Sequence, residues 1–437
     1  MKPGTIATAP PPRIGIRDAV ATLRSEPTHA RVLGGSIIML IGSGMVSVVN
    51  FGYNVAVARL LGPANFGHAA AAVTLLMLVS AITLSFQLVC AKFVARNETD
   101  SGKSSVYQLL NKRAWRVGVA IGSALILSSG VVAHYLNLPS PWIVILLALG
   151  IAFYIPLGVK RGGLQGTCSF QRLSWNFILE ASAKFVGAVV LVELGYGILG
   201  AVAAISFSVV LAYFFPAVPQ ELKKHPASEL PASFHEGMQA IVFFTGQVII
   251  NNVDILLVKH FFTSDQAGLY AAIALVGRVI YFASWSVVSA MFPISAGAQK
   301  KDESHSVLVV PLVMVLFISL VFIVGLTMFP EPILRTVFGP TFQIGSGMDS
   351  LMSLYAAATG CYSLGVVLMA YEMSRRIANT GWMQLVVSGA IVLGINFFHS
   401  SLHQVVVVQL ILMVVLLMIV SVPFFRFHRE AVFEEAA

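Results

Sequence analysis

The sequence predicts an all-α polytopic membrane protein in which twelve transmembrane helices form two pseudo-symmetric six-helix lobes. Three observations predict this class: a series of long apolar segments, a composition that is 57% hydrophobic and only 11% charged, and basic residues in every second gap between the segments. A soluble domain carries about 25% charged residues, so this chain has too few charges to cover a soluble surface.

Each apolar segment is long enough to cross the roughly 30 Å hydrocarbon core of a bilayer as a helix. The twelve segments are 32–58, 66–91, 117–136, 141–159, 173–194, 198–216, 237–258, 268–298, 306–329, 350–370, 382–398 and 404–425. We expect no soluble domain between them.

The basic residues indicate how the helices are oriented. Most of the 27 lysines and arginines precede the first segment, follow the last, or occupy the even gaps, as Lys160 and Arg161 do. The odd gaps hold only Arg59, Lys259 and Arg335. Because cytoplasmic loops carry an excess of lysine and arginine, both termini are expected to be cytoplasmic. The net charge of +8 then makes membrane lipids, and not nucleic acid, the expected partner.

The chain divides near its middle. We predict a cytoplasmic tail over 1–31, a six-helix lobe over 32–219, a polar linker over 220–236, a second six-helix lobe over 237–425 and a cytoplasmic tail over 426–437. An offset of 207 aligns Trp175 with Trp382, and an offset of 201 aligns Asn50 with Asn251 and Gly67 with Gly268. Parallel halves of this kind form transporters that bind substrate between the halves and alternate its access.

Polar residues recur at helical spacing inside two of the apolar segments. On the first segment the stripe is Ser43, Ser47, Asn50 and Asn54, and on the seventh it is Gln247, Asn251 and Asp254. Arg59 and Lys259 follow near the outer ends of the same two segments. Because bare amides and carboxylates are costly in hydrocarbon, both stripes should face the interior, either lining a hydrated cavity or hydrogen-bonding between helices.

Three further charged residues lie inside predicted helices. Arg278 is deep in the eighth segment, where it could pair with Asp254 or bind a substrate phosphate. Glu180 and Lys184 are four residues apart in the fifth segment, an order that favours an ion pair within one helix. The cavity candidates are therefore Asn50, Asn54, Arg59, Gln247, Asn251, Asp254, Lys259 and Arg278.

The sequence carries no motif for a catalytic or cofactor site. A phosphate loop, HExxH and GxSxG are all missing, and Gly162, Gly163 and Gly166 are expected in a short basic cytoplasmic turn. The three cysteines have unrelated spacings. We therefore expect no metal, no cofactor and no enzymatic activity.

Several runs resemble the Wzx-like polysaccharide and O-antigen flippases, the polysaccharide transporter branch of the MOP exporter superfamily. The run ARLLGPANFG over 58–67 resembles the family signature R-x-LG-P-x-x-FG, and the run over 251–270 resembles the start of the family's second half. Weaker similarities lie around 164–170 and 333–342. Carried over by position, the resemblance makes Arg59, Asp254 and Lys259 site candidates, whereas Arg278 rests on the physical argument alone.

The resemblance implies a MOP/MATE-like, two-lobed transporter in the bacterial inner membrane. Its expected substrate is a lipid-linked oligosaccharide on undecaprenyl diphosphate, and glycan polymerase and glycosyltransferases are possible partners. Two alternatives stay open. A cation-coupled multidrug antiporter would need buried carboxylates, for which the chain offers only Asp254, Glu180 and Glu193. A non-transport scaffold of a glycan-synthesis complex would require the polar stripes to be packed and dry.

Overall fold

A computed structural model describes residues 27–222, 235–297, 301–343, 345, 350–375 and 380–435. This described part is helical and contains no strand. Its helices are α2 (Pro27–Arg96), α3 (Asp100–Leu127), α4 (Ser129–Tyr135), α5 (Trp142–Gly166), α6 (Phe170–Leu191), η1 (Val192–Tyr196), α7 (Gly197–Phe214), η2 (Gln220–Leu222), α8 (His235–Ile250), α9 (Val253–Phe261), α10 (Ser264–Gly277), α11 (Val279–Gly297), α12 (Lys301–Met328), α13 (Pro330–Phe338), α14 (Leu351–Arg375), α15 (Met383–Phe397) and α16 (Leu402–Glu435). The all-α class predicted from the sequence is confirmed.

The described residues contain twelve apolar crossings, but not as twelve separate helices. Eight stretches are long and apolar enough to span a membrane, the bent pair α3 and α4 makes a ninth, and α15 is apolar but shorter. Two of the eight stretches, Ile41–Arg96 and Phe170–Phe214, each hold two crossings, because each is interrupted by glycine in a non-helical conformation.

In α2 the interruption is Gly62, whose φ of 72° is open to glycine but disfavoured for other residues. A straight helix of this length would extend far beyond the roughly 30 Å hydrocarbon core. Arg59 and Phe66, on either side of Gly62, both contact the segment that ends α13, so the chain turns between them. Gly62 with Pro63 forms the turn that the sequence signature predicts.

The second interruption joins α6 to α7. Gly195 and Gly197 have φ values of 91° and 53°, and a Cβ on Gly187 would lie 3.3 Å from the Cβ of Ala204. Residues equally far before and after the glycines are therefore in contact, which shows that the two helices run antiparallel.

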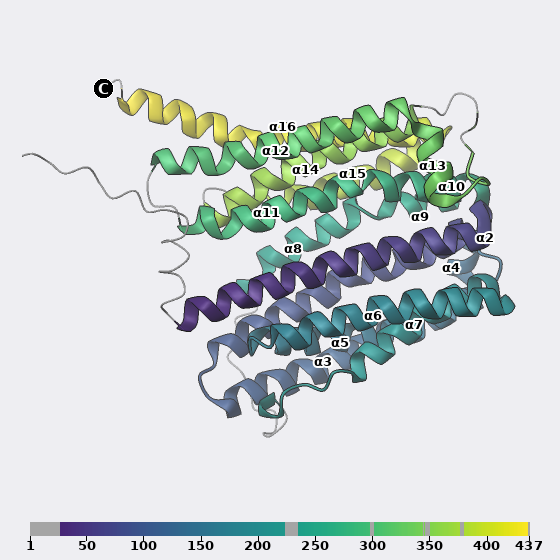
Figure 1. Cartoon of the computed structure of the whole chain (residues 1–437), viewed down its shortest axis with the longest axis horizontal. Helices are drawn as coiled ribbons and strands as arrows, with labels where there is room; N and C mark the ends of the chain where they lie inside the picture. Colours follow the sequence, from purple (N-terminus) through teal and green to yellow (C-terminus); the bar gives the residue numbers. More distant parts are fainter. Residues whose placement is uncertain are drawn as a thin grey trace, which may run out of the picture.

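The helices form two layers, with α2 along the seam between them (Figure 1). The N-terminal half, residues 27–222, packs α5, α6 and α7 together and against α2, and the C-terminal half, residues 235–435, packs α14 against α11, α12 and α16. The main helix contacts between the halves join α2 to α8, α9, α10 and α13. α2 therefore contacts both layers.

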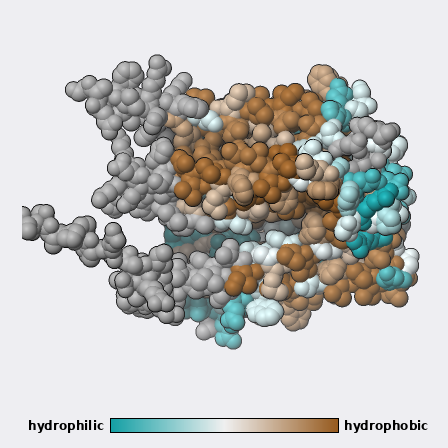
Figure 2. All heavy atoms as spheres, turned by 45° about the horizontal axis from the view of Figure 1, so that its top comes forward, coloured by the Kyte–Doolittle hydropathy of each residue, from teal (hydrophilic) through white to brown (hydrophobic). Residues whose placement is uncertain are grey.

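Apolar side chains cover the flanks of the bundle, as Figure 2 shows for one face. Large hydrophobic residues of α12 and α16 are exposed, including Phe317 at 66% and Met418 at 57%. In water such a surface would be unfavourable, whereas in a bilayer it is solvated by lipid. Its position fits the predicted membrane location.

The helices extend further than the apolar segments predicted. α3 already begins at Asp100, and α5 continues through Gly162, Gly163 and Gly166, so the short turn expected at these glycines is wrong. The prediction placed Lys160 in a cytoplasmic gap, but its side chain is buried and donates to the carbonyls of Ala212 and Tyr213. Apolarity marks the lipid-facing length of a helix, and a helix buried by protein can continue past it.

The predicted tails and linker fall largely outside the described residues. Residues 1–26, 223–234 and 436–437 are among those the structure does not describe. The boundaries proposed for the tails and for the linker at 220–236 therefore stay predictions.

Candidate functional site

The first polar stripe lies on the part of α2 that precedes Gly62. Ser43 and Ser47 are exposed, and Asn50 and Asn54 are half-buried. The Asn54 side-chain amide donates to the Asn50 backbone carbonyl at 2.8 Å, which holds the Asn54 side chain against its own helix. The stripe therefore runs from an exposed end to a partly enclosed one.

An apolar stripe on nearly the opposite side of the same helix is also exposed. Ile41, Met45 and Val48 are 61%, 50% and 72% exposed. At about 100° per residue, this stripe and the serine–asparagine stripe face in nearly opposite directions. One face of α2 therefore suits lipid and the other suits water. Figure 2 shows hydrophilic residues between the upper and lower parts of the molecule.

Lys184 of α6 meets this polar stripe at Asn50. Its ammonium donates to the Asn50 side-chain oxygen and lies 4.8 Å from the centre of the Tyr53 ring. The expected pair with Glu180 is wrong, because the Glu180 carboxylate forms an ion pair with Arg161 of α5 instead. Among the ion pairs of the described residues, none includes Lys184.

Arg161, like its neighbour Lys160, is a buried cation that the sequence analysis placed in a cytoplasmic gap. It is 4% exposed, donates to the Asn176 side-chain oxygen at 2.7 Å, and lies 4.0 Å from the centre of the Phe177 ring. Glu180 neutralises the Arg161 charge, and Asn176 accepts from its Nε. Arg161 therefore ties α5 to α6 and is not a residue of the cytoplasmic surface.

The second polar stripe, on α8 and α9, faces the core of the C-terminal half. Asp254 is 1% exposed and accepts from Arg278 at 3.0 Å through Oδ1, and from the hydroxyls of Tyr270 and Tyr355, both at 3.0 Å, through Oδ2. Gln409 of α16 donates to the Tyr270 hydroxyl at 3.1 Å. Four helices thus converge on one carboxylate whose charge is matched by a guanidinium.

Arg278 occupies a break in its helix. It follows α10 at the point where α11 begins, and its Nε also donates to the Tyr355 hydroxyl at 3.2 Å. The sequence left open whether Arg278 pairs with Asp254 or binds phosphate, and the structure forms the pair. A paired guanidinium has little net charge to offer an incoming anion.

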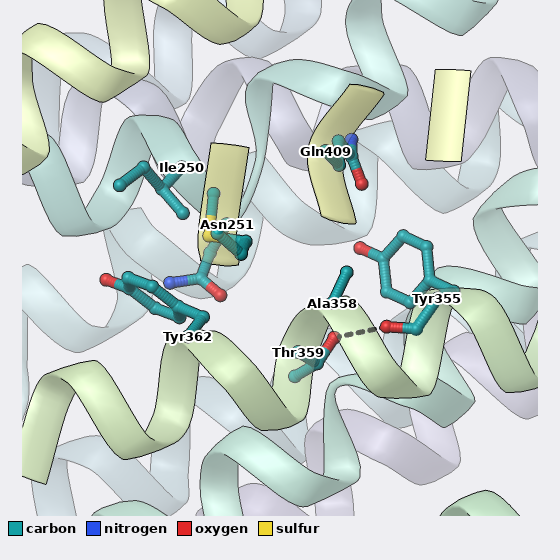
Figure 3. A pocket seen from close by; sticks show the side chains of 8 residues that line it. Ile250, Asn251, Tyr355, Ala358, Thr359, Tyr362 and Gln409 are labelled. Carbon is teal, nitrogen blue, oxygen red and sulfur yellow. Dashed lines mark hydrogen bonds between the residues drawn. The ribbon is translucent and has the colours of Figure 1, made fainter. Parts of the chain in front are cut away.

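A pocket of about 310 Å³, counting the open space at its mouth, lies beside this network. It is lined by Ile250, Asn251, Tyr355, Ala358, Thr359, Tyr362, Gln409 and Met413. Figure 3 shows the polar ends of Asn251, Thr359 and Gln409 among its lining side chains. Gln247, one turn before Asn251, is buried and donates to the Tyr281 hydroxyl. The second stripe is therefore largely enclosed within one half.

The remaining two candidates, Arg59 and Lys259, lie away from both stripes. Arg59 donates to the backbone carbonyls of Thr336 and Val337 at the end of α13. Lys259 donates to the carbonyl of Asn137 at 3.3 Å and to the hydroxyl of Ser264 at 3.0 Å. Both side chains connect the two halves or neighbouring turns, which is a structural use of their charge.

These contacts mark one end of the bundle, which we call the closed end: residues 59–68, 135–138, 259–268 and 336–342. α4, α9, α10 and α13 meet there, on the right of Figure 1. The Asn137 amide donates to the carbonyl of His260 at 2.9 Å, and the Tyr135 and His260 rings stack at 3.9 Å. The side-chain hydrogen bonds of Arg59, Asn137, Lys259 and His260 join the halves at this end.

Two glycines allow the halves to approach closely at the closed end. A Cβ on Gly268 would lie 1.8 Å from the carbonyl oxygen of Pro63, and one on Gly67 would lie 2.9 Å from the backbone nitrogen of Gly268. These are the glycines that the offset of 201 aligned. The structure places them face to face, so the pseudo-symmetric pair forms the contact between the halves.

Sequence reasoning missed the aromatic and lysine components of the site. Lys184 was set aside because its spacing from Glu180 explained it, and nothing in the spacing revealed Arg161 as the competing cation. Tyr270 and Tyr355 were hidden among apolar neighbours, where a tyrosine is ordinarily a core residue. An unpaired carboxylate at Asp254 was the signal that could have directed a search for hydroxyl donors.

Comparison with known proteins places the chain in a family. Residues 56–344, more than half of the chain, match the family described as polysaccharide biosynthesis protein. The protein belongs to this family. No curated protein sequence matches it.

Solved structures show the fold. An inward-facing multidrug resistance MATE family transporter of the MOP superfamily superposes with a TM-score of 0.74 at 13% identity, over 92% of this chain and 99% of that one. The lipid II flippase MurJ in an inward closed conformation gives 0.69 at 13% identity, over 89% and 87%. The outward-facing MATE transporter gives 0.60 at 15% identity, over 95% and 98%. The family match confirms the resemblance to polysaccharide biosynthesis proteins, and the solved structures show the fold expected from it.

Proposed function

We propose that this protein is a flippase for a lipid-linked oligosaccharide in the bacterial inner membrane. The substrate, carried on undecaprenyl diphosphate, would cross from the cytoplasmic to the outer leaflet by alternating access and supply cell-surface polysaccharide synthesis. Glycan polymerase and glycosyltransferases, as partners, stay predictions. The proposal joins membership of a polysaccharide biosynthesis family to a transporter fold.

One observation carries the proposal: the exposed polar stripe of Ser43, Ser47, Asn50 and Asn54 on the seam helix. Sugars and phosphates need hydrogen-bonding groups and water when they leave the aqueous phase, whereas a polyprenyl tail can stay in lipid. α2 offers polar and apolar faces on opposite sides over the same turns. This arrangement suits a substrate that is polar at one end and apolar at the other.

The conformation suits loading from the cytoplasm. The predicted orientation puts the closed end on the outer side of the membrane, because the odd gaps that carry Arg59, Lys259 and Arg335 lie there. The TM-score is higher against the inward-facing MATE transporter, at 0.74, than against the outward-facing one, at 0.60. An inward-facing flippase would accept substrate from the cytoplasmic leaflet, where glycan carriers are assembled.

The ion pairs of Asp254 and Glu180 argue against cation-coupled drug exchange through these two residues. Asp254 is matched by Arg278, Glu180 is matched by Arg161, and Glu193 is exposed. A carboxylate already neutralised by a guanidinium gains little from binding a proton or sodium ion. Coupling through Asp254 or Glu180 would first require an ion pair to open. Glu372 of α14, which the sequence analysis did not count, is also buried, accepts from the Thr380 hydroxyl and is in no ion pair of the described residues, so it stays available to a coupling cation.

The test is deletion of the gene with identification of what accumulates. We expect a lipid-linked glycan to accumulate on the cytoplasmic leaflet, measured by mass spectrometry of extracted lipids, and surface polysaccharide to fall. Re-expression of the wild-type chain should reverse both changes. Intact surface glycan together with greater drug sensitivity would overturn the proposal in favour of an antiporter.

A further inference from the structure

We propose that the Lys184 ammonium binds the diphosphate of the lipid carrier. Before substrate binds, the side chain of Asn50 accepts its hydrogen bond. This inference rests on the proposed function and assigns a place within it. Lys184 joins the polar stripe of α2 at its inner, partly enclosed part, and comes from α6 of the same half.

Lys184 differs from the other buried cations in the partners of its charge. Arg161 and Arg278 lie within apolar crossings, and each is paired with a carboxylate. Lys160 donates to two carbonyls at the end of α7, where the helix dipole is negative, and Lys259 donates to a carbonyl and a hydroxyl at the closed end. Lys184 contacts one amide oxygen and the face of one ring, and no ion pair of the described residues includes it.

The Lys184 ammonium has N–H donors that its contacts with Asn50 and Tyr53 do not use. It carries three N–H donors, of which the Asn50 oxygen accepts one. The Tyr53 ring offers a weak cation–π contact at 4.8 Å and cannot neutralise the charge. Glu180, one turn before Lys184, attracts the ammonium electrostatically, but its carboxylate is already paired with Arg161. A buried cation without an ion-pair partner of its own is costly, so an anionic ligand would gain both the Coulomb attraction and relief of that cost.

The route to Lys184 follows the stripe. Ser43 and Ser47 are exposed, and Asn50 and Asn54 are half-buried, so polar groups line α2 from the exposed part of the helix up to the ammonium. A diphosphate moving along the stripe would reach Lys184 before it reached the closed end.

The test measures binding by the full-length protein in nanodiscs. The probes are undecaprenyl diphosphate and undecaprenol, which share the tail and differ in charge. We expect wild type to prefer the diphosphate, Lys184→Gln to weaken diphosphate binding about ten-fold or more, and Lys184→Arg to retain most of it. Undecaprenol binding should be unchanged in all three.

Two further variants control the result. Asn50→Asp keeps the lysine but gives it a permanent carboxylate partner, so it should weaken diphosphate binding much as Lys184→Gln does. Lys112→Gln removes an exposed lysine of α3 and should have no effect. Asn50→Asp also separates loss of charge from misfolding, because an ion pair with Lys184 should preserve the melting temperature.

The outcomes separate the two proposals. If wild type binds diphosphate no better than undecaprenol, both the substrate class and the role of Lys184 fall. If wild type discriminates and Lys184→Gln discriminates equally well, only the role of Lys184 falls. Equal loss of both ligands in Lys184→Gln would also overturn it, because the effect would then not concern phosphate.

Discussion

The two halves place similar polar stripes in opposite environments. In the N-terminal half the stripe on α2 is exposed or half-buried, and it ends at a lysine without a carboxylate partner. In the C-terminal half the stripe on α8 and α9 turns into the core, where Asp254, Arg278 and two tyrosines satisfy one another. Asn50 and Asn251, aligned by the repeat, therefore serve different purposes.

This difference teaches that a repeated sequence pattern need not repeat a function. What each half can bind depends on whether its buried charges are already neutralised by partners within the protein. The C-terminal network is complete without a ligand and stabilises the packing of four helices, whereas the N-terminal lysine is completed only when an anion arrives. The substrate should therefore bind asymmetrically, to the N-terminal half.

The largest effect should come from breaking the C-terminal network. Asp254→Ala leaves Arg278 buried without a counter-ion, which we expect to cost about 3–5 kcal/mol of stability. Thermal unfolding of the purified protein in nanodiscs measures this. The double variant Asp254→Ala with Arg278→Met should recover most of the loss, because both charges are then removed. If the single and double variants melt alike, the network does not carry the stability assigned to it.

The second-largest effect should come from the glycine contact between the halves at the closed end. Gly268→Ala puts a Cβ against the Pro63 carbonyl, and the overpacking should cost the closed end about 1–3 kcal/mol. Electron-spin distances between labels at Asn65 and Asp265, both exposed, should lengthen as this end opens. Gly52→Ala is the matched control, since its Cβ would meet no atom within 4 Å. An unchanged distance in Gly268→Ala would argue that the glycine contact does not hold the end closed.

The ion pair of the N-terminal half allows a finer test. Glu180→Gln should cost about 1–2 kcal/mol, because Arg161 keeps its bond to Asn176 and Glu180 is partly exposed. A double-mutant cycle should show coupling of Glu180 with Arg161 and little with Lys184. Strong coupling between Glu180 and Lys184 would support the ion pair that helical spacing predicted, and it would contradict the assignment of Glu180 to Arg161.

The smallest effect should come from Lys184 itself. Lys184→Met removes a buried charge that has no counter-ion, so stability should change by less than about 1 kcal/mol and could rise. Glycan export in cells should nevertheless fall sharply, measured as surface polysaccharide. A fall in stability as large as that of Asp254→Ala would instead assign Lys184 to the packing of α6 on α2.

Much of the fold could be predicted because membrane spans leave a local signal. Apolar length marks each crossing, and the run from Arg59 to Gly67 marks the first turn, so these features needed no tertiary information. Segment ends were less predictable: Lys160 and Gly162 looked like a cytoplasmic turn, yet burial by neighbouring helices carries α5 past them. Polarity alone does not distinguish a cytoplasmic residue from one buried in the bundle.

The sequence by itself determined the helical class, the crossings, the family and the identity of the two polar stripes. Only the tertiary structure decided which charges neutralise each other. Glu180 forms its ion pair with Arg161 and not with Lys184, and Arg278 forms its ion pair with Asp254. The physical reason is that apolar length and periodicity are properties of single helices, whereas a buried ion pair depends on distances between helices that spacing along the chain does not contain.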